Sequence, residues 1–139
     1  MVGVVVATHG ELAEALLRTV AGVCGPLERG RAVTISHDSA MEEARAQLAA
    51  AIQAVDDGDG VLVLTDMLGG TPANLALSFL DEKIEVVTGV NLPMLTKLTT
   101  CRAERTPLRE TAQALAAYGQ KNITLASELL RTRARTTRA

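Results

Sequence analysis

Short runs of β-branched residues alternate with longer stretches of helical periodicity along most of this 139-residue chain. The first run, residues 2–7, is continuously apolar, as expected of a strand that is buried on both faces. Similar runs predict strands over residues 32–36, 61–65 and 84–88. Because strands that alternate with helices are joined by right-handed crossovers, the sequence predicts one doubly wound α/β domain, with a mainly parallel sheet and helices on both faces.

The stretches between these runs predict the helices. Ser39 and Glu42 have the spacing of a capping box and predict that a helix begins there. Thr71 is predicted to cap another helix, whose first residue would be Pro72, a favoured place for proline. Residues 92–100 predict a short helix, and a last long helix is expected from about residue 106 to a stop at Gly119.

The C-terminal region is less sharply patterned. Residues 123–126 are predicted as an antiparallel edge strand, with a helix through the leucines that follow as the alternative. Residues from about 131 to 139 are rich in arginine and are predicted to form a flexible, solvated tail rather than a nucleic-acid arm. The whole of residues 1–139 is expected to be one domain.

Composition excludes several classes of function. Phe79 and Tyr118 are the two aromatic residues, and the net charge is −2, so neither base stacking nor a basic surface favours a nucleic-acid partner. Cys24 and Cys101 form no CxxC pair, which suits a reducing compartment. With no basic leader and no apolar run of about 18 residues, we expect a cytoplasmic protein that does not insert into membranes.

Three polar segments follow predicted strands, at residues 7–10, 66–71 and 89–91. Ligands of open α/β sheets bind at the carboxyl ends of strands, so these segments are expected at one edge. His9 has two interpretations: a structural residue that hydrogen-bonds locally in the turn between strand and helix, or a reactive imidazole. Asp66 either caps a loop or holds the Nδ1–H of His9, which would leave the Nε2 lone pair free to attack. His37 also follows a strand and is expected to be a solvated loop residue.

The segment Gly69, Gly70 and Thr71 has both a structural and a functional interpretation. It can simply begin a helix, or its unbonded N–H groups and hydroxyl can hold an anion. The sequence contains neither GxxxxGK nor GxGxxG after the first strand, and it has no HExxH motif or cluster of Cys and His for zinc. A histidine, a carboxylate and an anion-binding loop, with no metal, suit phosphoryl transfer between histidines.

These segments, ATHG at 7–10, DMLGGTPAN at 66–74 and GVNLPML at 89–95, resemble in order the signature loops of the mannose-family enzyme IIA. That enzyme is a component of the bacterial phosphoenolpyruvate-dependent sugar phosphotransferase system. The resemblance covers residues 2 to about 100. It implies a doubly wound fold, a homodimer assembled with a final strand, and no metal or organic cofactor.

The resemblance also implies roles for individual residues. His9 would accept a phosphoryl group on Nε2 from the carrier protein HPr, with Asp66 paired to it. Gly69, Gly70 and Thr71 would bind the phosphoryl group. The acceptor would be a histidine of an enzyme IIB on a separate chain, which serves sugar uptake.

Apolar residues near the same loops are expected to be exposed and to form a docking surface for these partners: Met67, Leu68 and Met94. Three other functions stay open at this point. The same histidine would serve only as a signal in an incomplete phosphotransferase system, or the chain would donate phosphoryl groups to dihydroxyacetone kinase, or it would bind anions without catalysis.

Overall fold

The computed structural model describes residues 1–36 and 38–138. At its centre lies one parallel sheet of four strands in the order β2-β1-β3-β4. The strands are β1 (Gly3–His9), β2 (Gly30–Ile35), β3 (Val61–Thr65) and β4 (Ile84–Thr88). The predicted parallel sheet is therefore confirmed, and β1 and β3 are its central strands.

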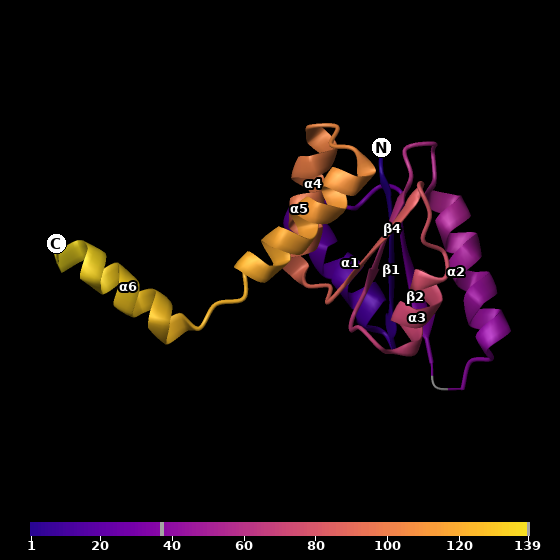
Figure 1. Ribbon diagram of the computed structural model, residues 1–139, viewed down its shortest axis with the longest axis horizontal. Coiled ribbons are helices and arrows are strands. Elements are labelled where there is room, and N and C mark those ends of the chain that lie inside the picture. The colour runs from indigo at the N-terminus through magenta and orange to yellow at the C-terminus, as the bar shows by residue number, and fades with distance from the viewer. Residues whose placement is uncertain (37, 139) are drawn as a thin grey trace.

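Helices cover both faces of the sheet (Figure 1). On one face lie α1 (Leu12–Cys24), α4 (Leu92–Ala103) and α5 (Leu108–Lys121), and on the other lie α2 (Met41–Val55) and α3 (Thr71–Leu77). A further helix, α6 (Ala126–Arg138), lies apart from the body. Among the described residues, no helix combines the length and the apolar character that crossing a bilayer requires.

The continuous apolar run of β1 is explained by two cores, one on each face. Side chains alternate between the faces of a strand, so Val4 and Val6 pack under α1 and α4, whereas Val5 and Ala7 pack under α2 and α3. All four are fully buried. Full burial of a valine contributes about 1.5–3 kcal/mol, so this strand strongly specifies the centre of the fold.

Parallel pairing brings the carboxyl ends of the strands to one edge. Ala7 pairs with Thr65, and Thr65 pairs in turn with Thr88. The backbone N–H of Val90 donates to the carbonyl of Thr65 at 2.9 Å, and that of Gly10 donates to Ile35 at 3.3 Å. The loops that follow β1, β3 and β4 are thereby gathered at the same edge of the sheet.

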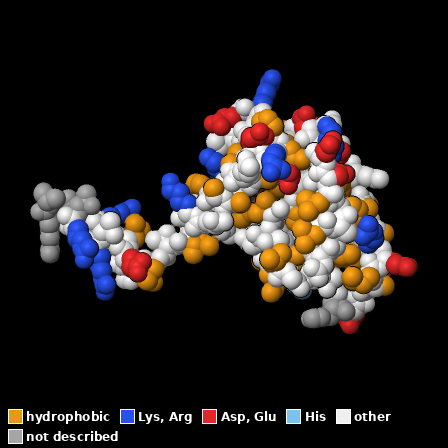
Figure 2. Space-filling view, viewed as in Figure 1, with side chains coloured by type: hydrophobic (Ala, Val, Ile, Leu, Met, Phe, Trp, Pro, Cys, Tyr) orange, Lys and Arg blue, Asp and Glu red, His pale blue; other side chains and the backbone are white. Residues whose placement is uncertain are grey.

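The C-terminal region differs from the predicted antiparallel edge strand. Residues 123–125 have no regular structure, and a helix begins at Ala126. The alternative interpretation, a helix through the leucines, is therefore confirmed for Leu129 and Leu130, whereas Leu125 precedes the helix. The predicted tail falls on the second half of α6, along which Figure 2 shows basic side chains. Residue 139 lies outside the described residues.

Helix ends also differ from prediction in three places. The predicted capping box fails because the Ser39 hydroxyl bonds to the Ser36 hydroxyl at 2.8 Å, and α2 begins after Ala40. Thr71 is the first residue of α3, not its cap. Gly119 does not end α5 but lies buried within it, where the absence of a side chain leaves room for Met94.

Candidate functional site

His9 and Asp66 are 57 residues apart in sequence but lie side by side at the carboxyl edge of the sheet. His9 ends β1, and Asp66 follows the neighbouring strand β3. One carboxylate oxygen of Asp66, Oδ2, lies 2.8 Å from the Nδ1 atom of His9 and accepts the backbone N–H of His9 at 3.2 Å. The other, Oδ1, accepts the N–H of Met67 at 3.1 Å. The aspartate thus fixes both the ring and the main chain of His9.

The electrostatics of the pair determine the tautomer of the histidine. Burial disfavours the ionised form of Asp66, but hydrogen bonds from the ring and main chain of His9 outweigh it, so the pKa of Asp66 lies below its ordinary value. An ionised carboxylate only accepts hydrogen bonds, so Nδ1 of His9 carries the proton. The lone pair of the neutral ring is then on Nε2. The side chain of His9 is 42% exposed and therefore accessible.

Gly70 lies beside the Cε1 and Nε2 atoms of the imidazole. A Cβ atom added at Gly70 would lie 2.6 Å from Cε1 and 3.1 Å from Nε2 of His9. Gly69, just before it, has a φ of +87°, a conformation that favours glycine, whereas Thr71 after it is exposed at the start of α3. The structure therefore brings Gly70 directly to His9, with Gly69 and Thr71 as its chain neighbours.

Thr8 is a positioning residue that the sequence analysis did not single out. Its side chain is fully buried, and its Oγ1 accepts the backbone N–H of Ala13 at 2.8 Å. This bond caps α1, whose own N-cap residue Glu11 makes no side-chain cap. Thr8 thereby ties the helix after His9 to the strand before it. A hydroxyl residue at the end of a buried strand is the signal that points to such a role.

The three apolar residues predicted to form a docking surface do not all lie on the surface. Met67 and Leu68 are 57% and 70% exposed, as expected. Met94 is 2% exposed, and the prediction that it is exposed is wrong. Its N–H donates to Oδ1 of Asn91, which caps α4, and its side chain packs inward against Gly119. His37 lies outside the described residues.

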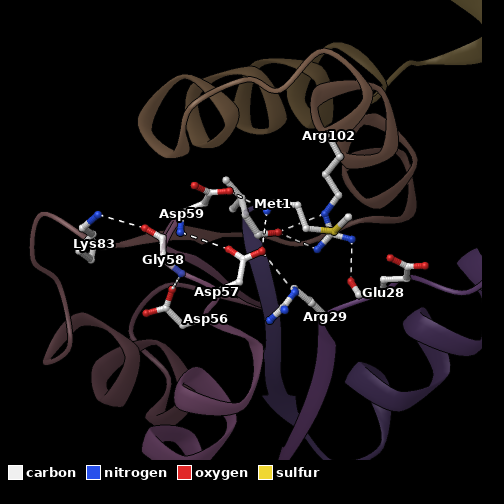
Figure 3. A network of polar contacts seen from close by, with 10 residues as sticks. Met1, Glu28, Arg29, Asp56, Asp57, Gly58, Asp59, Lys83 and Arg102 are labelled. Carbon is white, nitrogen blue, oxygen red and sulfur yellow. Dashed lines mark hydrogen bonds and ion pairs between the residues drawn. The ribbon is translucent and has the colours of Figure 1, made fainter.

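A second polar network lies at the opposite, amino-terminal end of the sheet (Figure 3). The amino group of Met1 contacts Asp57 at 2.7 Å, and the guanidinium of Arg102 donates twice to the carbonyl of Val2. Burial lowers the pKa of Arg102. A cavity of about 730 Å³ beside it is lined by Arg102 and Lys83 among others. It is well separated from His9, so it is not part of the histidine–aspartate site.

Together, the fold and the site define an α/β protein with a partly exposed histidine held by a carboxylate at the carboxyl edge of a parallel sheet. Residues 3–116 match the family EIIA-man, which is described as the PTS system fructose IIA component. The matched stretch contains both members of the histidine–aspartate pair and the glycine loop.

Individual relatives agree with this match. The chain is 29% identical over 132 residues to the PTS system fructose-specific EIIA component of Bacillus subtilis, covering 94% of this chain and 90% of that protein. It is 31% identical to a putative phosphotransferase enzyme IIA component of Escherichia coli, covering 76% of this chain and 74% of the other.

A solved structure is similar over nearly the whole chain. It is the PTS IIA protein associated with the fucose utilization operon of Streptococcus pneumoniae, with 28% identity and a TM-score of 0.81, covering 92% of this chain and 95% of that one. This chain belongs to the EIIA-man family. It is an EIIA component of the phosphotransferase system, of the mannose and fructose type.

Proposed function

We propose that this chain is a histidine phosphocarrier, which accepts a phosphoryl group from phospho-HPr on Nε2 of His9 and passes it to a histidine of a separate enzyme IIB. The observation that carries the proposal is the 2.8 Å contact between Nδ1 of His9 and Oδ2 of Asp66. It leaves Nε2 as the nucleophilic atom of a partly exposed ring. Membership of the EIIA-man family supports the same role.

In this mechanism the Nε2 lone pair attacks phosphorus as the bond to the donor's nitrogen breaks in line with it. The ring gains positive charge as the new N–P bond forms. Asp66, ionised and hydrogen-bonded to Nδ1–H, stabilises that charge without taking the proton. The negatively charged phosphoryl oxygens need donors at the same edge, and Gly69, Gly70 and Thr71 are proposed to supply them. Transfer to enzyme IIB is the reverse step with a new acceptor.

Met67 and Leu68 are proposed to contact the two partner proteins. Both are exposed and follow Asp66 directly in the chain, so a protein that docks on them is brought to His9. Because the carrier must release one partner before it meets the next, we expect a small interface that buries less than about 1,200 Å².

A homodimer in the cytoplasm remains part of the proposal. β4 is an outer strand of the sheet, and outer strands offer unpaired main-chain groups to a second chain. Sedimentation equilibrium of the full chain tests the dimer, and a mass equal to one chain at micromolar concentration would remove it from the proposal.

The phosphocarrier role is tested by incubating the protein with labelled phosphoenolpyruvate, enzyme I and HPr. We expect an acid-labile, base-stable label on the wild-type protein and on His37→Ala, and none on His9→Ala. Label that persists on His9→Ala would place the phosphorylated residue elsewhere. A wild-type protein that takes no label would contradict the proposed function itself.

A further inference from the structure

We propose that Gly70 is a positioning residue that holds the imidazole of His9, and that a glycine is required there by the ring and not by the backbone. Asp66 holds Nδ1 of the ring, and Gly70 lies beside the ring, where an added Cβ atom would be 2.6 Å from Cε1. The rate consequence of this contact rests on the proposed phosphocarrier function, whereas the contact itself does not.

The two adjacent glycines are needed for different physical reasons. Gly69 has a φ of +87°, which side chains rarely adopt, but a Cβ atom there would meet nothing within 4 Å. Gly70 has φ −86° and ψ 168°, an extended conformation open to any residue. Its Cβ would nevertheless lie 2.6 Å from Cε1 of His9, closer than real Cβ atoms approach other atoms. The imidazole is therefore the neighbour that excludes a side chain at position 70.

Neither partner in this contact can move away freely. His9 is paired with Ile35 in the sheet, and Asp66 bonds to both its ring and its main chain. The carbonyl of Gly70 accepts the N–H of Asn74 at 3.0 Å and so belongs to the first turn of α3. A methyl group at position 70 must rotate the ring away from Asp66 or displace the start of α3.

Rotation of the ring would move the atom that reacts. Phosphoryl transfer depends on in-line approach, and a misplacement of about 1 Å costs on the order of 100-fold in rate. We therefore expect Gly70→Ala to accept phosphoryl groups from phospho-HPr roughly 100-fold more slowly than the wild type. We also expect less of the Nδ1–H tautomer, because the hydrogen bond to Asp66 is lost or lengthened.

The test compares Gly70→Ala with Gly69→Ala, each made with and without His9→Ala. Thermal unfolding is followed by circular dichroism. Gly70→Ala should lower Tm when His9 is present and should have little effect when the ring has been removed. Gly69→Ala is the matched control, because its backbone strain does not involve the ring. It should lower Tm equally in both backgrounds.

A second measurement reads the ring directly. Nitrogen-15 NMR of the imidazole in a His37→Gln background, where His9 is the single histidine, should show Nδ1–H for the wild type and for Gly69→Ala, and a reduced Nδ1–H population for Gly70→Ala.

The outcomes decide the proposal in every case. If Gly70→Ala lowers Tm equally in the wild-type and His9→Ala backgrounds, the imidazole is not what excludes the side chain. The same conclusion follows if Gly70→Ala fails to fold in both backgrounds. An unchanged tautomer in Gly70→Ala would also overturn the proposal. If Gly70→Ala fails to fold but folds once His9→Ala is added, the proposal is supported. A wild type that takes no label contradicts the phosphocarrier function, yet the unfolding and NMR comparisons still decide the role of Gly70.

Discussion

Replacing Met94 with alanine tests whether this residue belongs to the core, as the structure shows, or to a docking surface. Its side chain is 2% exposed and packs against Gly119 in α5. Truncation of a buried methionine costs about 2–5 kcal/mol, and we expect a loss of about 3 kcal/mol here. For a chain of this length, that corresponds to a fall in Tm of roughly 10 °C.

Met67 provides a matched control, because it is also a methionine near the site but is 57% exposed. Met67→Ala should change the free energy of unfolding by less than about 0.5 kcal/mol. Urea unfolding followed by far-ultraviolet circular dichroism suits both variants, since the chain has no tryptophan. If Met94→Ala were as stable as Met67→Ala, the burial of Met94 and the packing of α4 on α5 would both be refuted. For HPr as donor, we expect only Met67→Ala to raise KM.

Three further predictions follow from single groups. The pKa of Asp66 is held below 3.8, so the stability that this group contributes is present above that pH and is lost as pH falls through its folded pKa. In Asp66→Asn, the free energy of unfolding should therefore fall less steeply below about pH 4 than in the wild type, and an unchanged pH dependence there would contradict the pairing. The same variant should label more slowly on His9. Burial raises the pKa of the Cys101 thiol, whereas Cys24 is exposed, so a thiol reagent should modify only Cys24 until the protein is unfolded, and fast native labelling of both would contradict this. Gly22→Ala, at an exposed position in the last turn of α1, should stabilise the protein by up to about 1 kcal/mol in urea unfolding, and a destabilised variant would contradict the open space around Gly22.

The centre of the sheet could be predicted from the sequence because its two central strands are short apolar runs, as expected of strands that are buried on both faces. The run at residues 2–7 is the clearest case, since both faces of β1 are covered by helices. The region after residue 122 could not be predicted in the same way. The spacing of Leu125 and Leu129 is typical of a helix, yet residues 123–126 also fit a short strand. Whether a strand forms there depends on whether a neighbouring strand is available to pair with it, which the sequence does not show.

The pairing of His9 with Asp66 was predictable because one topological rule brings the carboxyl ends of parallel strands together. The direction of a helical side chain is not fixed by such a rule. Met94 follows the helix cap at Asn91, and the rotation of α4 about its axis, set by packing on α5, turns its side chain inward. The hydrogen bond from the N–H of Ala13 to Oγ1 of Thr8 was missed because it spans five residues and matches no local capping pattern.

The segment after β3 supplies both residues that position the imidazole of His9. Asp66 begins this segment and holds Nδ1 of His9, and Gly70 ends it against Cε1 and Nε2. The sheet, by contrast, only brings the segment to His9 through the pairing of β1 with β3. Changes that weaken the sheet should therefore reduce phosphoryl transfer in proportion to the loss of folded protein. Changes within residues 66–70 should reduce transfer in molecules that are still folded, because they alter the direction in which the reacting nitrogen points.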